Sequence, residues 1–223
     1  MKRVMSEEEK KAKLQAFFAK ASEAYNAGRR EDAKNILLEA HEVDPQNAAI
    51  LNDLGSICHM LRKLTEAYEY YSMAYALDKN DPMIANSLGL VCDDQGKTDD
   101  AKEWYKKALG INSNHLNSLN NLGSLLLKIK EYEESQRCLE QAVKLENDLP
   151  KENKMVRAHF NLGLLYARQN KIEEAKKIWE QVLTINETHN ATVDALWVLK
   201  NYAQSETPKI VEIFEKVLVP EVA

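Results

Sequence analysis

Three asparagines recur at a fixed interval, and their side chains are suited to binding a polypeptide. Asn52, Asn86 and Asn120 lie 34 residues apart. Each amide has donors and an acceptor, so it can pair with the N–H or the C=O of an extended backbone without selecting its sequence. The chemistry that this series indicates is therefore recognition, and we expect the three side chains to be exposed.

Features that resemble catalytic or metal sites have simpler explanations. Gly96-Lys97-Thr98 resembles the end of a phosphate-binding loop, but the preceding glycine, Gly89, lies too far upstream for the spacing of that loop. Cys58 and Cys92 lie 34 residues apart without a partner at metal-ligand spacing, so we interpret them as small core residues. We expect no catalytic residue, no metal and no cofactor.

The same 34-residue period organises the elements that must position these side chains. Leu54-Gly55, Leu88-Gly89 and Leu122-Gly123 follow it. Apolar residues in 64–77 recur at intervals of three and four, which predicts an amphipathic helix. We expect each Gly, and the small residue twelve positions later, to lie where two antiparallel helices touch. A period of this length is typical of stacked repeats.

The full pattern resembles the tetratricopeptide repeat, in which a small residue, a bulky residue and a second small residue follow Leu-Gly. The bulky residues here are Tyr71, Tyr105, Leu139 and Trp179. The resemblance implies an all-α fold, a right-handed α-solenoid of stacked antiparallel helix pairs with about 12 helices. We predict one array over residues 1–223, with units at about 14–47, 48–81, 82–115, 116–149 and 156–189, and a divergent sixth unit at 190–223 that caps the stack.

The ends and one insertion depart from the period. Ser6 and Glu9 form a plausible capping box, which predicts a first helix from near residue 7 to about Ala27. Six extra residues around 150–155 separate the fourth and fifth units, and Pro150 favours an early helix start there. Near the C-terminus, an apolar stripe from Ile210 to Leu218 predicts a last helix.

The resemblance also implies a ligand surface, because the first helix of each unit lines a concave groove in this family. Two or three residues before the Gly position, the chain has seven candidate peptide-binding residues: Phe18, Asn52, Asn86, Asn120, Asn121, Phe160 and Asn161. Asn at this position is also ordinary in the family. Lys128, Arg157 and Arg168 form a candidate patch for an acidic ligand, and the alternative is a solvated helix face.

One partner class is disfavoured. Tetratricopeptide domains that bind chaperone tails use Lys and Asn in one unit and Asn in the next, but this chain has Phe18, Ser22 and Asp53 at those positions. The resemblance therefore does not extend to chaperone binding.

Composition supports a protein-binding role. The net charge of −5 disfavours a nucleic-acid partner. No apolar run reaches the length of a membrane span, and the N-terminus lacks the pattern of a secretory signal, so we expect a cytoplasmic protein. We predict a non-catalytic adaptor or scaffold that binds a peptide segment of another protein in its groove. The alternatives are a structural scaffold that self-associates through residues 190–223 and an enzyme with an unrecognised site. The sequence leaves the identity of the partner open.

Overall fold

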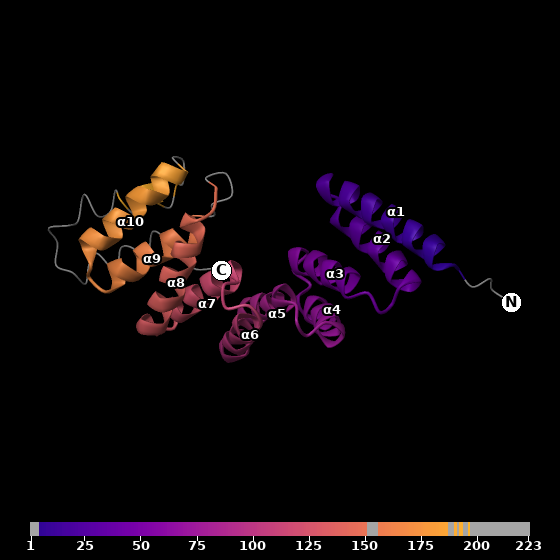
Figure 1. Cartoon of the computed structure of the whole chain (residues 1–223), viewed down its shortest axis with the longest axis horizontal. Helices are drawn as coiled ribbons and strands as arrows, with labels where there is room; N and C mark the ends of the chain where they lie inside the picture. Colours follow the sequence, from indigo (N-terminus) through magenta and orange to yellow (C-terminus); the bar gives the residue numbers. More distant parts are fainter. Residues whose placement is uncertain (1–4, 151–155, 187–189, 191, 194–195, 197–223) are drawn as a thin grey trace. The chain divides into compact units, whose positions relative to one another are not determined.

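The computed structural model describes residues 5–150 and 156–186, together with residues 190, 192, 193 and 196. Within this part of the chain there are ten helices and no strand (Figure 1). The helices belong to two compact units, residues 1–113 and residues 114–223. The all-α class predicted from the repeat pattern is therefore confirmed.

The first unit contains three antiparallel helix pairs, drawn from indigo to magenta in Figure 1. Within each pair the two helices pack on one another, and α2 packs on α3 as α4 packs on α5. Within this unit, each helix therefore packs on the helices that precede and follow it in sequence. The bounds are α1 Glu7–Asn26, α2 Arg30–Val43, α3 Ala48–Met60, α4 Leu64–Leu77, α5 Pro82–Asp94 and α6 Thr98–Ile111.

The second unit contains two helix pairs: α7 Leu116–Lys128 with α8 Tyr132–Asn147, and α9 Arg157–Arg168 with α10 Ile172–Ile185. Helix α9 packs on α8 and also contacts α7. Pro150 follows α8, and the helix start expected from it falls on residues 151–155, outside the described residues. The sixth unit expected at 190–223 lies outside them too, apart from four isolated positions.

The Leu-Gly positions are the points of closest approach within each pair. A Cβ atom on Gly89 would lie 2.5 Å from Cε1 of Tyr105, and one on Gly55 would lie 2.6 Å from Cδ1 of Tyr71. The glycine is therefore covered by the bulky residue sixteen positions later, rather than mainly by the small residue twelve positions later. The small position contributes in the second unit, where the Ser135 hydroxyl donates to the Gly123 carbonyl at 2.7 Å.

The first helix of every pair ends in the same way. After α5, the Lys97 N–H donates to the Cys92 carbonyl at 2.8 Å and the Gly96 N–H donates to the Asp93 carbonyl at 2.9 Å. This is the Schellman motif, which requires a left-handed residue just after the helix. Five residues have such a conformation, with φ from 61° to 75°: Gly28, Arg62, Gly96, Lys130 and Asn170.

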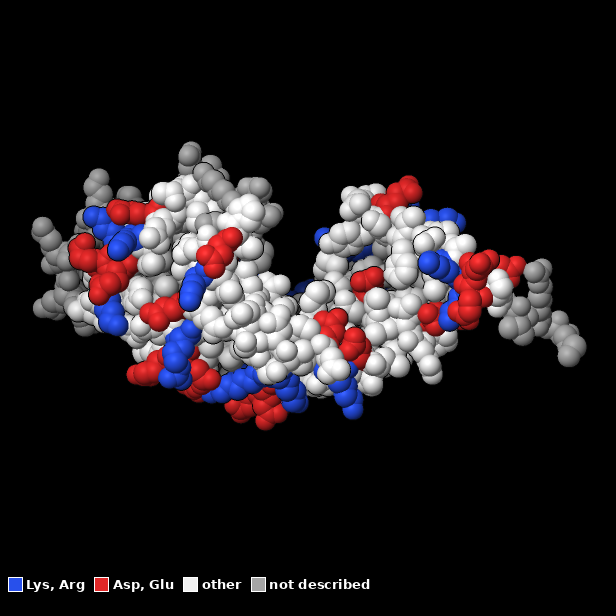
Figure 2. All heavy atoms as spheres, in the orientation of Figure 1, with Lys and Arg blue, Asp and Glu red and all other residues white. Residues whose placement is uncertain are grey.

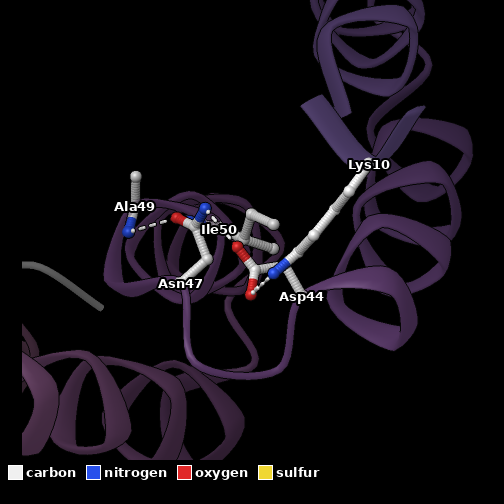
Figure 3. Close-up of polar contacts among 5 residues, drawn as sticks. All are labelled: Lys10, Asp44, Asn47, Ala49 and Ile50. Atoms are coloured by element: carbon white, nitrogen blue, oxygen red, sulfur yellow. Dashed lines mark hydrogen bonds and ion pairs between the residues drawn. The ribbon is translucent and has the colours of Figure 1, made fainter. Parts of the chain in front are cut away.

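Side chains fix the starts of α1 and α3. Ser6 and Glu9 form the expected capping box, and α1 begins at Glu7 and ends at Asn26. The Asn47 side chain accepts from the N–H groups of Ala49 and Ile50 at the start of α3. Its amide donates to Asp44, which also binds Lys10 of α1 at 2.8 Å (Figure 3). The hydrogen bond from Lys10 lowers the pKa of Asp44. This network ties α1 to the start of α3.

Candidate functional site

A cavity of about 380 Å³ opens between α1 and α3 in the first unit. Helix α2 contributes one residue to its wall, Leu37. The remaining lining comes from the two first helices of neighbouring pairs, where the family resemblance places a ligand surface. The lining residues on these helices are Phe18, Ala21, Ser22 and Tyr25 of α1, and Asp53, Ser56, Ile57 and Met60 of α3.

The two helices supply these residues with identical spacing. On each helix they stand at positions i, i+3, i+4 and i+7, which form one face of an α-helix over two turns. Most of the lining is apolar or aromatic, and Tyr25 donates its hydroxyl to Sδ of Met60 at 3.5 Å at one end. The cavity therefore resembles an ordinary ligand pocket, with apolar walls and few polar groups.

Asp53 is the charged residue of this lining. Its side chain is half-buried, and burial raises the pKa of its carboxyl above the ordinary value of 3.8. Among the described residues it makes no hydrogen bond or ion pair. A partly desolvated carboxylate without a partner is unfavourable when ionised, so it favours a ligand that brings a donor or a positive charge.

The predicted asparagines of the first unit lie on α3 and α5. Asn52 is half-buried, and its Oδ1 atom is buried without a hydrogen-bond partner in the described part of the chain. Asn86 is only 6% exposed, although the sequence led us to expect an exposed side chain. At this level of exposure its amide offers little surface to a ligand.

In the second unit the asparagines bind one another. Asn120 on α7 is 6% exposed, so the expectation of exposure is wrong here as well. The Asn161 amide of α9 donates to Oδ1 of Asn120 at 3.2 Å, and both Asn161 and Asn121 are half-buried. This bond joins the first helices of two successive pairs, which gives both residues a structural role in addition to any role in binding.

The two candidate phenylalanines differ in their surroundings. Phe18 lines the cavity between α1 and α3. Phe160 is half-buried and stacks on Trp179, with 6.1 Å between the ring centroids, while its carbonyl accepts from the Trp179 indole at 3.1 Å. Phe18 therefore lies at the cavity wall, whereas Phe160 helps to hold α9 against α10.

The three basic candidates do not form one cluster. Arg157 is the first residue of α9 and Arg168 is its last, so roughly 16 Å of helix separates them at 1.5 Å per residue. Lys128 ends α7, and Arg168 donates to the carbonyl of the preceding residue, Leu127, at 2.9 Å. Arg168 thus stabilises the end of α7. On the face drawn in Figure 2, basic side chains lie among acidic ones, without an area of positive charge alone.

The cysteines are core residues. Cys58, Cys92 and Cys138 are buried and form no disulfide with one another. Burial raises the pKa of the Cys58 and Cys92 thiols, which favours the unreactive thiol form. Within the described ranges, no group of three or more His, Cys, Asp or Glu side chains is placed to hold a metal ion. No helix among them is long and apolar enough to cross a membrane.

Sequence comparison places the repeats in a known family. Three profiles of the tetratricopeptide repeat match residues 18–82, 84–115 and 114–188. A search of curated protein sequences finds no match.

Solved structures of low sequence identity share the fold. PilF of Pseudomonas aeruginosa is 18% identical and aligns with a TM-score of 0.74 over 95% of this chain and 94% of its own. MamA of Desulfovibrio magneticus is 16% identical, with a TM-score of 0.66 over 84% of this chain and 99% of its own. YrrB, described as having an unusual peptide-binding site, is 17% identical, with a TM-score of 0.60 over 80% of this chain and 89% of its own.

Proposed function

Because the chain belongs to the tetratricopeptide repeat family, a family of protein-interaction modules, we propose that it is a non-catalytic adaptor that binds an extended segment of a partner protein. The proposed surface in the first unit is formed by α1, α3 and α5. It contains Phe18 and Asn52 of the candidate set, whereas Asn86 on α5 is buried.

The observation that supports this proposal best is the cavity between α1 and α3, together with the adjacent Asn52. Buried polar atoms in proteins are nearly always hydrogen-bonded, and Oδ1 of Asn52 is buried without a partner among the described residues. Because the Asn52 side chain as a whole is only half-buried, a turn of its amide toward the surface would let a backbone N–H of a bound segment satisfy this oxygen. The apolar walls would meanwhile accept a side chain of the same segment.

The fold relatives support the class of ligand. YrrB, which shares this fold at 17% identity, is described as a tetratricopeptide repeat protein with an unusual peptide-binding site. A fold likeness at this sequence identity supports a peptide-binding surface as a class. The residues of the present chain determine which peptides that surface would bind.

The test begins with a pull-down and continues with titration calorimetry on the captured partner. Of the three asparagines that the sequence singled out, Asn86 and Asn120 are buried, so replacing Asn52, Asn86 and Asn120 together with Ala should weaken binding mainly through Asn52, by about threefold to tenfold at about 0.5–1.5 kcal/mol for one hydrogen bond. Asn86 and Asn120 are buried, so this triple variant also needs a melting curve.

Asn52→Ala alone gives a sharper test, because its oxygen gives up no hydrogen bond within the described chain. We expect it to weaken binding about threefold to tenfold with an unchanged melting point. The control is Lys128, Arg157 and Arg168 replaced together with Ala, which should matter only for an acidic partner and should be mimicked by salt. Unchanged affinity in Asn52→Ala and in both triple variants would place the interface elsewhere.

The alternative of a self-associating scaffold involves residues 190–223, which lie almost wholly outside the described residues. Size-exclusion chromatography with light scattering separates the two functions. An adaptor should elute as a monomer at all concentrations tested. The molar mass of a self-associating scaffold should instead increase with protein concentration.

A further inference from the structure

The charged residue of the α1–α3 cavity indicates which side chain the partner inserts. We propose that this cavity receives an arginine side chain of the bound segment, with its guanidinium on Asp53 and its aliphatic stem along the apolar wall. This inference rests on the proposed function and adds the chemistry of the ligand to it.

The first argument is charge complementarity. Asp53 lines the cavity half-buried and makes no hydrogen bond or ion pair among the described residues. An aliphatic or aromatic occupant would remove it further from water without offering a partner, which is unfavourable for a carboxylate. An acidic occupant would add repulsion. A basic occupant satisfies the carboxylate and is the class that the cavity favours.

The second argument is that Lys10 of α1, Lys34 of α2 and Arg29, which directly precedes α2, already have carboxylate partners. Lys10 binds Asp44 at 2.8 Å (Figure 3), Arg29 binds Asp32 at 3.3 Å, and Lys34 binds Glu66. The lining of the cavity itself contains no Lys or Arg. A positive charge for Asp53 is therefore best supplied from outside the chain.

The third argument selects arginine over lysine. The rings of Phe18 and Tyr25 and the side chains of Ile57 and Met60 lie in the same lining as Asp53. A guanidinium is planar, can form two parallel hydrogen bonds to a carboxylate and stacks on aromatic rings. Its stem of methylene groups suits the apolar wall. Lysine offers a more strongly hydrated charge that is harder to desolvate.

Asp53 has no acidic counterpart at the equivalent positions of the other first helices. The corresponding residues are Ala19 in α1, Ser87 in α5, Asn121 in α7 and Asn161 in α9. Among the five described first helices, an acidic residue at this position therefore occurs in α3 alone. It follows that one substitution is enough to remove it.

The test is a selection from a random peptide library displayed on phage, performed against the immobilised full chain and against Asp53→Asn. Glu39→Gln removes one negative charge from an exposed position of α2 and serves as the control for net charge. We expect peptides enriched by the wild type and by Glu39→Gln to share an arginine at a fixed position. Asp53→Asn should lose that preference.

Titration calorimetry with the best peptide then measures the energetic coupling between the peptide arginine and Asp53. Replacing its arginine with methionine, or Asp53 with Asn, should each weaken binding about tenfold or more, and the two changes together should be little worse than either alone. Replacement with lysine should weaken binding less than replacement with methionine. Enriched peptides without a basic residue, or equal affinity for Asp53→Asn, would overturn the arginine assignment but keep the proposed function. Enrichment of no peptide at all would overturn both.

Discussion

At the scale of single residues, the glycines of the Leu-Gly positions give the most direct test of the packing. Gly89→Leu should lower the free energy of unfolding by about 2–4 kcal/mol, because even a Cβ atom at this position would lie 2.5 Å from the Tyr105 ring. Thermal melting monitored by circular dichroism measures the change.

Gly110→Ala provides the matched control, because Gly110 also lies in a helix but a Cβ atom there would meet nothing within 4 Å. It should leave stability unchanged or raise it by up to about 1 kcal/mol through helix propensity. Equal effects of the two substitutions would contradict the assignment of Gly89 to the helix contact.

The raised pKa of Asp53 leads to a separate prediction about how stability depends on pH. Burial raises the pKa of its carboxyl in the folded chain, so the folded state binds its proton more tightly than the unfolded state does. The contribution of Asp53 to the free energy of unfolding should therefore fall as the pH rises from its unfolded-state pKa of 3.8 through its raised folded-state pKa. Asp53→Asn should remove this loss. Its melting point should exceed that of the wild type at pH 7 and approach it near pH 4.

The control for that comparison is again Glu39→Gln, an exposed position for which no such pH-dependent gain is expected. Burial also raises the pKa of Tyr71, which therefore titrates well above this range. A gain in melting point that is the same at both pH values would show that ionisation of Asp53 is not its cause.

Residue spacing predicted which positions share a helix face, but not how deeply they are covered. The series of Asn52, Asn86 and Asn120 illustrates this limit. The repeat period places all three at one point of the first helices, yet Asn86 and Asn120 are only 6% exposed. Depth depends on the next helix pair: Asn120 accepts a hydrogen bond from Asn161, which lies 41 residues away. No local pattern contains that contact.

At the scale of helices, sequence signals located the starts better than the ends. The Ser6–Glu9 box correctly predicted the start of α1. Glycine is typical of the left-handed turn that follows a helix and occupies it at Gly28 and Gly96, whereas Arg62, Lys130 and Asn170 occupy the same turn without any glycine. Such residues adopt this conformation at a cost of roughly 1–2 kcal/mol, which packing of the flanking helices offsets. Residue propensity alone therefore does not indicate the left-handed conformation of Arg62 and Lys130.

A buried pair joins α8 to α9 and was not expected from sequence. Nδ1 of His159 lies 2.7 Å from a carboxylate oxygen of Glu146, and the two side chains are 1% and 2% exposed. His159→Leu should destabilise the chain by about 3–5 kcal/mol, because it leaves the Glu146 carboxylate buried without this partner. Chemical denaturation of the full chain measures the loss.

The matched variant is the double substitution of Glu146 and His159 with Leu. It should be less destabilising than the sum of the two single changes, because it removes both buried polar groups of the hydrogen bond together. Strict additivity in this double-mutant cycle would show that the two side chains do not interact energetically. His159 carries no sequence signal of this role, since its partner lies across the insertion that interrupts the period.

At the scale of the whole molecule, the helices contact mainly their neighbours in sequence. The stability of such a chain is close to a sum of terms within and between adjacent pairs. An internal pair is covered on both sides, whereas a terminal pair needs a polar outer face or a cap. Residues 190–223, the predicted cap of the single array over residues 1–223, lie almost wholly outside the described residues. The array and its cap therefore remain predictions.

The last prediction tests that cap. Ile210, Ile213, Phe214, Val217 and Leu218 form the apolar stripe of the helix expected near the C-terminus. If this helix covers the preceding pair, deleting residues 190–223 should expose apolar surface, including part of the surface near Ile178 and Val182, and promote association. Light scattering should show a molar mass of the truncated chain that increases with protein concentration. The melting point of the truncated chain should be lower than that of the full chain. Deleting residues 219–223 alone spares the stripe and should change neither property. A monomeric truncated chain with an unchanged melting point would show that residues 190–223 do not stabilise the repeats.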